Sequence, residues 1–304
     1  MLADTHKLLW EAQRGRYAVG HFNINNMEIV QGVVHAAQRM KSPVILATSE
    51  GALNYAGMKY LYALARVASE NARVPVALHL DHGRDVSIIK EAIRVGYSSV
   101  MIDASHESFE RNVLITRRVV GWARRKHISV EAELGTIGGV EDTVRSRNIL
   151  YTDPIKAKEF VERTGCDSLA VAIGTSHGAY KFEGRAKLHQ QLLEEIRQKV
   201  KIPLVLHGAS GVPLALITQA EKYGAKLTGV QGVPDVEIRS AIRRGICKIN
   251  TDTDIRVAFD AAVRKVISTQ PQDFDPRHIL GPAREIIQRV VEQRMKLFGS
   301  VGKA

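Results

Sequence analysis

The sequence predicts an α/β protein built as a closed (β/α)8 TIM barrel with a C-terminal helical extension. Short β-rich runs alternate with segments of helical spacing, such as residues 27–40, 109–126 and 189–200. There are eight such runs, and a core of about 250 residues is typical of the barrel. A doubly wound open sheet is the alternative, but it usually carries a glycine-rich fingerprint that is missing after the first run. The expected strands are residues 17–25, 43–49, 75–81, 99–105, 129–135, 168–174, 203–208 and 247–252.

No low-complexity tract or linker divides the chain, so we expect one barrel domain over residues 1–304. Pro43, Pro75 and Pro203 stand at expected strand starts, where a missing N–H group is tolerated. Residues 270–304 lie beyond the eight units and form the expected helical tail, with a helix at 281–299.

Composition excludes several classes of protein. The 45% hydrophobic content is that of a soluble globular protein, and no apolar run approaches the ~20 residues of a bilayer crossing, so no membrane partner is expected. The N-terminus lacks the apolar region of a signal peptide, and Cys166 and Cys247 fit reduced thiols in a cytoplasmic protein. The net charge of +11 is dispersed and no nucleic-acid motif appears, so no nucleic-acid partner is expected. Phosphorylated metabolites and a simply solvated basic surface both remain compatible with this charge.

Polar side chains gather toward the C-terminal ends of the expected strands, where barrel enzymes build their active sites. Every second residue of a barrel strand faces the interior. One such residue usually only caps a loop, but here several strands share the pattern. His79 lies deeper and is interpreted as a buried, hydrogen-bonded residue rather than a metal ligand. The inward-facing polar set is Asn23, Ser49, His79, Asp81, Ser99, Asp103, Ser129, Glu131, Glu133, His207, Lys248, Asn250 and Asp252.

Three histidines, His82, His177 and His207, are each followed directly by glycine, which lets the backbone turn sharply and lets a ligand approach. Three neutral imidazoles with one open position form a catalytic zinc site, although no local HExxH or CxxC pair supports the spacing. Asp103 and Glu133 would add oxygen ligands nearby, either behind the histidines or at a second cation position.

The last two loops predict a phosphate site. Residues 207–211 form a glycine-rich turn, and residues 250–254 lead directly into a helical segment whose free N–H groups attract anions. The loops after strands seven and eight are the usual phosphate site of these barrels. Thr251, Asp252 or Thr253 could also simply cap the helix, and both interpretations can hold together.

Motifs over nearly the whole chain resemble those of the class II (zinc-dependent) fructose-bisphosphate aldolases. They are FNINN (22–26), SEGA (49–52), HLDHG (79–83), SVMIDASH (99–106), VEAELG (130–135), GGVED (138–142), GTSHGAYK (174–181), LVLHGASG (204–211), KINTDTD (248–254) and DPR (275–277). The resemblance implies reversible cleavage of fructose 1,6-bisphosphate to dihydroxyacetone phosphate and glyceraldehyde 3-phosphate through a zinc-stabilised enediolate, a step of glycolysis and gluconeogenesis.

The resemblance also implies roles for particular residues. Asp81 would be the acid/base at the substrate's C4 oxygen, and Glu141 a second catalytic carboxylate. A monovalent cation (K+ or Na+) would lie nearby, and the protein would be a homo-oligomer, dimer or tetramer, in which Arg277 reaches an adjacent subunit's site. The zinc ligands would be His82, His177 and His207, with Asp103 and Glu133 at a second divalent position. The substrate-binding set would be Asn23, Ser49, Gly178, Gly208, Ala209, Ser210, Asn250, Thr251, Asp252, Thr253 and Arg277.

The sequence departs from the family pattern at HGRD (82–85), where Arg84 replaces part of a small serine-rich turn near the mouth, and it resembles the longer members at residues 226–239. Tagatose-bisphosphate aldolase is the alternative enzyme, disfavoured because Arg277 belongs to a tail that such enzymes tend to lack. A Schiff-base aldolase would need a lysine on strand six, and the only strand candidate, Lys248, begins strand eight. A non-catalytic metal-binding scaffold would have no reason to keep the carboxylates and the three histidines together.

Overall fold

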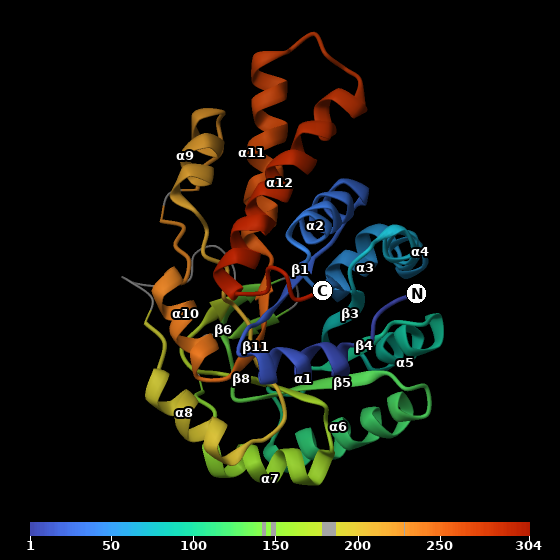
Figure 1. Cartoon of the computed structure of the whole chain (residues 1–304), viewed down its shortest axis with the longest axis vertical. Coiled ribbons are helices and arrows are strands. Elements are labelled where there is room, and N and C mark those ends of the chain that lie inside the picture. Colours follow the sequence, from blue (N-terminus) through green and yellow to red (C-terminus); the bar gives the residue numbers. More distant parts are fainter. Residues whose placement is uncertain (142–143, 147–149, 178–186, 228) are drawn as a thin grey trace.

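A computed structural model describes residues 1–141, 144–146, 150–177, 187–227 and 229–304, and gives only the backbone of residues 138–141, 144–146 and 177. Eight parallel strands close into a barrel in the order β1-β11-β10-β8-β5-β4-β3-β2 (Figure 1). Because the ring closes, the predicted barrel is confirmed and the open sheet is wrong. The barrel strands are β1 (Val19–Asn23), β2 (Val44–Thr48), β3 (Val76–Gly83), β4 (Ser99–Ile102), β5 (Ser129–Leu134), β8 (Ser168–Val171), β10 (Leu204–Leu206) and β11 (Ile246–Thr251).

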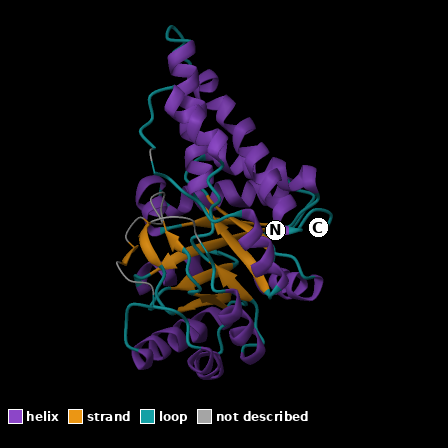
Figure 2. Cartoon of the chain, turned by 90° about the vertical axis from the view of Figure 1, so that its left-hand side faces the viewer, coloured by secondary structure: helices purple, strands orange, loops and turns teal. Residues whose placement is uncertain are grey.

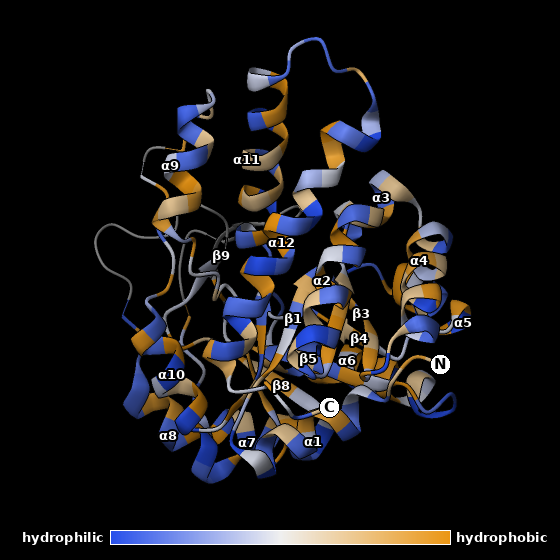
Figure 3. Cartoon of the chain, turned by 45° about the horizontal axis from the view of Figure 1, so that its top comes forward, coloured by the Kyte–Doolittle hydropathy of each residue, from blue (hydrophilic) through white to orange (hydrophobic). Residues whose placement is uncertain are grey.

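Helices surround the barrel on all sides, with hydrophobic and hydrophilic residues alternating along each of them (Figures 2 and 3). Their apolar faces pack on the outward-facing Val, Ile and Leu residues of the strands in one continuous core. These helices are α1 (Thr5–Gly15), α2 (Met27–Met40), α3 (Glu50–Ala56), α4 (Met58–Asn71), α5 (Val86–Val95), α6 (Phe109–Arg124), α7 (Pro154–Thr164), α8 (Gln190–Lys199), α9 (Leu214–Lys222), α10 (Asp235–Arg243), α11 (Thr253–Thr269) and α12 (Pro276–Phe298). Among the described residues, none of them has the length and apolar composition that crossing a bilayer requires.

Most of the expected strands are shorter in the structure, and two of them end three residues early. The run at 99–105 ends as β4 at Ile102, because Asp103 already turns to accept hydrogen bonds from the backbone and side chain of Ser105. The run at 168–174 ends as β8 at Val171, and the chain re-enters extended structure as β9 (Ser176–His177). This short strand joins β6 (Gly138–Glu141) and β7 (Val144–Ser146) in a separate three-stranded sheet.

The tail helix was predicted at 281–299 but begins at Pro276. Asp275 caps it by accepting a hydrogen bond from the backbone N–H of Arg277 at 2.9 Å, and Pro276 occupies the first turn, where its missing N–H costs nothing. The later Pro282 lies inside the helix rather than before it. Capping at Asp275 therefore outweighs the helix-breaking signal of the second proline.

The tail packs on its own barrel. Helices α11 and α12 lie side by side and extend beyond the barrel (Figures 1 and 2), and α12 then packs along α2. The approach is close, since a Cβ on Gly32 would lie 2.9 Å from the carbonyl oxygen of Arg284. Buried Val291, Met295 and Phe298 join the main core through this contact. The tail is therefore part of the fold and not a detachable appendage.

The interior of the barrel changes character along its axis. At the N-terminal end, α1 closes the barrel with a small apolar cluster that includes Leu8, Leu9 and Tyr17. Above it lies a thin apolar layer of Met101, Ala170 and Val205. Other interior positions are polar and buried: His21, His79, Ser99, Ser129, Glu131, Ser168 and Lys248. Such polar groups are costly to bury without partners, so the interior of the barrel must hold a network of hydrogen bonds and ion pairs.

Candidate active site and metal centre

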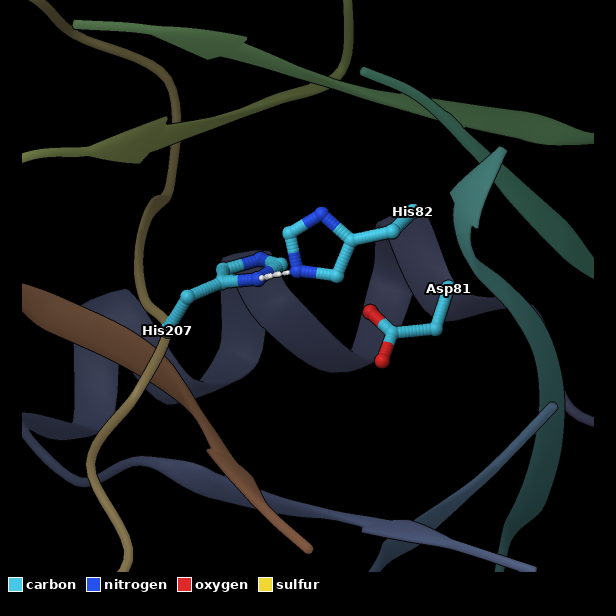
Figure 4. Close-up of side chains that lie close together, drawn as sticks. All are labelled: Asp81, His82 and His207. Carbon is cyan, nitrogen blue, oxygen red and sulfur yellow. Dashed lines mark hydrogen bonds between the residues drawn. The ribbon is translucent and has the colours of Figure 1, made fainter. Parts of the chain in front are cut away.

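The end of β3 presents two adjacent residues, Asp81 and His82, to the same space (Figure 4). Regular alternation would point one of them outward. The pairing of β3 with β4 shifts between Leu80 and Gly83, and His82 has a φ of 46°, in the left-handed region. Such a bulge re-aims side chains beside active sites. Gly83 completes it, because a Cβ there would lie 2.6 Å from the carbonyl oxygen of Met101.

His82 meets His207, which follows β10, across the mouth of the barrel. Nε2 of His82 lies 2.8 Å from Nδ1 of His207, and the two rings are nearly perpendicular (Figure 4). The opposite ring nitrogens face carboxylates: Nδ1 of His82 lies 3.2 Å from Oδ2 of Asp103, and Nε2 of His207 lies 2.7 Å from Oε1 of Glu131. An ionised carboxylate can only accept, so those nitrogens are the donors, and a single proton joins the two nitrogens that face each other.

The carboxylates around the two rings favour positive charge at the facing nitrogens, carried either by a proton or by a metal ion. Burial by itself opposes charge on His82, but Asp81, Asp103 and Glu133 outweigh it and raise the pKa of His82 to about 10. Burial and the charge of His82 lower the pKa of His207. Ligand atoms of Asp81, His82 and His207 all lie within 4.8 Å of one another, as do those of His82, Asp103 and Glu133. Imidazoles whose far nitrogens donate to carboxylates are the usual ligands of zinc, so the donor set fits a metal ion.

Two side-chain amides, one at each oxygen, hold the carboxylate of Asp81. Nδ2 of Asn23 donates to its Oδ2 at 3.0 Å, and Nδ2 of Asn250 donates to its Oδ1 at 3.2 Å. Burial favours the protonated acid, yet His21, His82 and His207 outweigh it and hold the pKa of Asp81 well below its usual range. The carboxylate is therefore ionised and can accept a proton.

Beneath His207 lies a buried ion pair that links two strands that are not neighbours in the barrel. Nζ of Lys248, on β11, lies 2.9 and 3.1 Å from the carboxylate oxygens of Glu131, on β5. Burial opposes ionisation of Glu131, but Lys248 and the hydrogen bond from His207 lower its pKa overall. His79 is buried beside this pair, with Nδ1 2.5 Å from Oγ of Ser99, as the sequence predicted. Sequence alternation placed Glu131 and Lys248 inward but did not predict this pairing.

On the other side, Asp103 accepts hydrogen bonds at both oxygens. Oδ2 receives His82 Nδ1 and two nitrogens of Arg84, each at 3.2 Å, and Oδ1 receives Ser105 Oγ at 2.7 Å. Burial raises its pKa, but His82, Ser105 and Arg84 together lower it far more. Glu133, beside it, is buried; its Oε2 lies 4.0 Å from Nδ1 of His82 and accepts no hydrogen bond among the described residues. Burial and the charge of Asp103 raise the pKa of Glu133 to about 8.

The loops after β10 and β11 meet where a phosphate was predicted. Gly208 has a φ of 62°, and a Cβ there would lie 2.7 Å from the carbonyl oxygen of Ser176, so this close approach requires glycine. Ala209 and Ser210 are buried, and Ser210 Oγ accepts from the backbone N–H of Asp252 at 3.2 Å. Helix α11 begins directly afterwards, at Thr253.

The capping interpretation of that segment holds only in part. Asp252 stands at the N-cap position of α11, but its carboxylate pairs with Arg256 at 2.8 Å and makes no capping hydrogen bond among the described residues. Thr251 is buried at the end of β11. Ser49 does cap α3, accepting from the backbone N–H of Ala52 at 3.2 Å.

A family model described as "Fructose-bisphosphate aldolase class-II" matches residues 3–303. The fructose-bisphosphate aldolase of Thermus caldophilus is 50% identical over 306 residues, covering 100% of both chains. The chain belongs to the class-II fructose-bisphosphate aldolase family. The fructose-bisphosphate aldolase of Giardia intestinalis is 47% identical, covering 100% of this chain and 94% of the relative.

Solved aldolase structures share the whole fold. The YdjI aldolase from Escherichia coli K12 has a TM-score of 0.82 at 37% identity, with 100% of both chains covered. A fructose-1,6-biphosphate aldolase from Coccidioides immitis, described as putative, has a TM-score of 0.81 at 30% identity, covering 99% of this chain and 98% of that one. The resemblance predicted from the motifs is thus confirmed: this chain is a metal-dependent class-II aldolase, a lyase, and it carries candidate metal-binding groups.

Three residues expected of a class-II aldolase fall where little or nothing is described. Glu141 ends β6 and His177 ends β9, and the backbones of these strands pair through Gly139 and His177, but their side chains lie outside the described residues. Gly178 lies outside the described residues altogether. The two strands that end at Glu141 and His177 therefore pair with each other, and the roles of these two residues stay predictions.

Arg277 stands apart from this site. It lies in the first turn of α12, near the end of the helical pair that extends beyond the barrel (Figure 1), with 84% of its side chain exposed. Its guanidinium pairs with Asp275, the capping residue of the same helix, at 2.5 Å. Within this chain Arg277 therefore contacts no other site residue that the structure describes.

Proposed function

We propose that the protein catalyses the reversible cleavage of fructose 1,6-bisphosphate into dihydroxyacetone phosphate and glyceraldehyde 3-phosphate. The observation that carries the proposal is the ionised Asp81 beside the facing nitrogens of His82 and His207. His82 and His207, with His177, would hold the metal, which we propose to be zinc because its ligands here are imidazoles. The bound metal would supply Lewis-acid polarisation of the substrate's ketone oxygen.

In the cleavage direction, Asp81 accepts the proton of the C4 hydroxyl. The C3–C4 bond then breaks, its electrons remain with C3, and C4 leaves as the aldehyde carbon of glyceraldehyde 3-phosphate. A proton returned to C3 completes dihydroxyacetone phosphate, and we assign that transfer to Glu141. The amides of Asn23 and Asn250 fix the carboxylate of Asp81 from both sides, which keeps one oxygen aimed at the substrate.

Substrate binding is proposed for the loops after β10 and β11 together with the first strands. Gly208, Ala209 and Ser210 would bind the dihydroxyacetone phosphate end with Gly178, because glycine and small residues let backbone N–H groups approach a phosphate. The N-terminus of α11 adds its partial positive charge. The remaining proposed contacts come from Asn23, Ser49, Asn250, Thr251, Asp252 and Thr253. A monovalent cation, K+ or Na+, is proposed beside this phosphate.

The direct test is metal removal with assays on two substrates. EDTA should abolish cleavage of fructose 1,6-bisphosphate and added zinc should restore it, whereas borohydride with substrate should leave the enzyme active. A covalent adduct trapped by borohydride would contradict the metal mechanism. Faster cleavage of tagatose 1,6-bisphosphate, which differs at one stereocentre, would instead assign the enzyme to that substrate.

A composite site in a homo-oligomer, dimer or tetramer, is proposed for Arg277, whose exposed position beyond the barrel suits contact with another subunit. Binding the distant C6 phosphate by a charged hydrogen bond is worth ~1.5–3 kcal/mol, or roughly 10–100-fold in rate constant. Arg277→Ala should lower kcat/KM for fructose 1,6-bisphosphate by about that factor and spare proton exchange at C3 of dihydroxyacetone phosphate. Equal loss in both assays, tracking loss of oligomer, would mean that Arg277 only supports α12.

The same proposal places the enzyme in the cytoplasm, with a phosphorylated sugar as its partner and neither nucleic acid nor membrane. Both Cys166 and Cys247 are buried free thiols, which suits a reducing compartment. Fractionation of the source cells tests this location directly.

A further inference from the structure

The position where a second divalent ion was expected, at Asp103 and Glu133, already contains a cationic side chain. Nε and one terminal nitrogen of Arg84 lie 3.2 Å from Oδ2 of Asp103, and this oxygen also receives Nδ1 of His82 at 3.2 Å. The other oxygen receives the backbone N–H and the hydroxyl of Ser105, at 3.2 and 2.7 Å. Both oxygens therefore have their lone pairs directed at protein donors.

The arginine is held in place by the turn that follows β3. Oε1 of Glu50, the first residue of α3, accepts from the backbone N–H groups of Arg84 and Asp85 at 2.8 and 2.9 Å. Asp85 then caps α5 by accepting from the backbone N–H of Ser87 at 2.7 Å. These hydrogen bonds fix the backbone on both sides of Arg84, and so they fix the position of its Cα atom. Only 27% of it is exposed, so it lies over Asp103 and not out in solvent.

A divalent cation and this guanidinium compete for the same lone pairs. A metal at this position would need at least one free oxygen of Asp103, since Asp103, Glu133 and His82 are the described groups that could hold it. The guanidinium is always charged and donates in a fixed plane, so it offsets the charge of Asp103 without any ion. Its engagement with Asp103 also makes Arg84 a poor candidate for binding substrate at the mouth.

We propose that Arg84 takes the place of the second divalent cation in this aldolase, which therefore binds one metal ion per chain, at His82 and His207. The proposal rests on the assignment of the catalytic metal made above. The departure from the family pattern at residues 82–85 is then a change in metal stoichiometry. The residues of the second position do not fit an ion while Arg84 is present.

The test is the zinc stoichiometry of the full-length enzyme, measured by calorimetric titration of the metal-stripped protein and by elemental analysis after dialysis. The wild type should bind one zinc ion per chain. Arg84→Ser, which restores a small side chain, should bind a second ion, and adding Asp103→Asn to it should remove that ion again. Arg94→Ser serves as the matched control, because Arg94 is an exposed arginine on α5 that pairs only with surface Glu91 among the described residues.

Two ions on the wild-type chain would overturn the proposal, whether or not the variants fold. One ion on a folded Arg84→Ser protein would overturn it as well. The zinc content of His82→Ala distinguishes failure of the Arg84 proposal from failure of the proposed function. If the wild-type ion survives His82→Ala, the catalytic-metal assignment is wrong, whereas loss of that ion leaves the count on Arg84→Ser as the test of Arg84.

Discussion

Two arms of the site have the same chemical order and lie in different surroundings. In the deep arm, His207 donates to Glu131, which pairs with Lys248. In the rim arm, His82 donates to Asp103, which pairs with Arg84. Each arm thus runs from imidazole to carboxylate to cation. The side chain of Lys248 is fully buried inside the barrel, whereas 27% of Arg84 is exposed at the mouth.

The comparison shows where a buried charge must be neutralised by protein groups and where solvent also stabilises it. Glu131 is buried, so protein groups must stabilise its charge: among the described residues these are Lys248 and His207, with the hydroxyl of Ser168 3.5 Å from Oε2. Losing Lys248 leaves a buried charge without its partner in a low-dielectric surrounding. Asp103 has donors from three residues and lies beneath a partly solvated arginine. The stability of the fold should therefore depend more on the deep arm than on the rim arm.

The largest expected effect is on stability. Lys248→Met removes one partner of a buried ion pair and should lower the free energy of unfolding by about 3–5 kcal/mol. Arg84→Ser removes a partly exposed cation and should cost about 1 kcal/mol or less. Urea unfolding of both metal-stripped variants, followed by circular dichroism, measures the two values. Equal losses would erase the distinction between the arms.

A smaller effect separates metal binding from stability. Glu131→Gln weakens the acceptor that orients His207, so zinc affinity should fall by about 10–100-fold. The double variant Glu131→Gln/Lys248→Met contains neither buried charge and should be more stable than Lys248→Met alone. Its zinc affinity should stay low. Chelator competition measures the affinities, and normal zinc binding by the double variant would show that Glu131 has no role in orienting His207.

The smallest effect is expected at the rim. Ser105→Ala removes one donor from Asp103 and should lower the unfolding free energy by only about 0.5–1.5 kcal/mol. The backbone N–H of residue 105, at 3.2 Å, still binds the same oxygen. A loss as large as that of Lys248→Met in the same urea experiment would mean that the rim carboxylate depends on each of its donors.

Much of the fold could be predicted because the barrel repeats one unit with a clear period. Eight apolar runs and their spacing predicted the closed sheet, whereas the tail helix was predicted to start at residue 281 and starts at Pro276, after the cap at Asp275. What sequence period could not predict was the bulge at the end of β3. Alternation turns His82 away from the barrel, and only the register shift with β4 turns it back.

The sequence predicted which residues form the site but not how their side chains pair. Motif resemblance named His82, His207 and Asp81, all of which the structure brings together. The pairing of Glu131 with Lys248 joins strands that are not neighbours in the barrel, so no local pattern contains it. The contact between Arg84 and Asp103 depends on a turn held by Glu50 from a third element.

The central claim is that the adjacent residues Asp81 and His82 have separate tasks, proton transfer and metal binding. The claim is open to a direct challenge, because the carboxylate of Asp81 lies close enough to the histidine nitrogens to be a ligand itself. Against this, both of its oxygens accept amide hydrogen bonds from Asn23 and Asn250.

The most direct measurement is the zinc content of purified Asp81→Ala and His82→Ala, taken beside cleavage rates. We expect Asp81→Ala to retain zinc and bind dihydroxyacetone phosphate while kcat falls by about 10²–10⁴-fold, the usual contribution of a general base. His82→Ala should lose both zinc and activity, because ligation and retention of the ion are coupled. Equal loss of zinc from the two variants would contradict the account and make Asp81 a ligand.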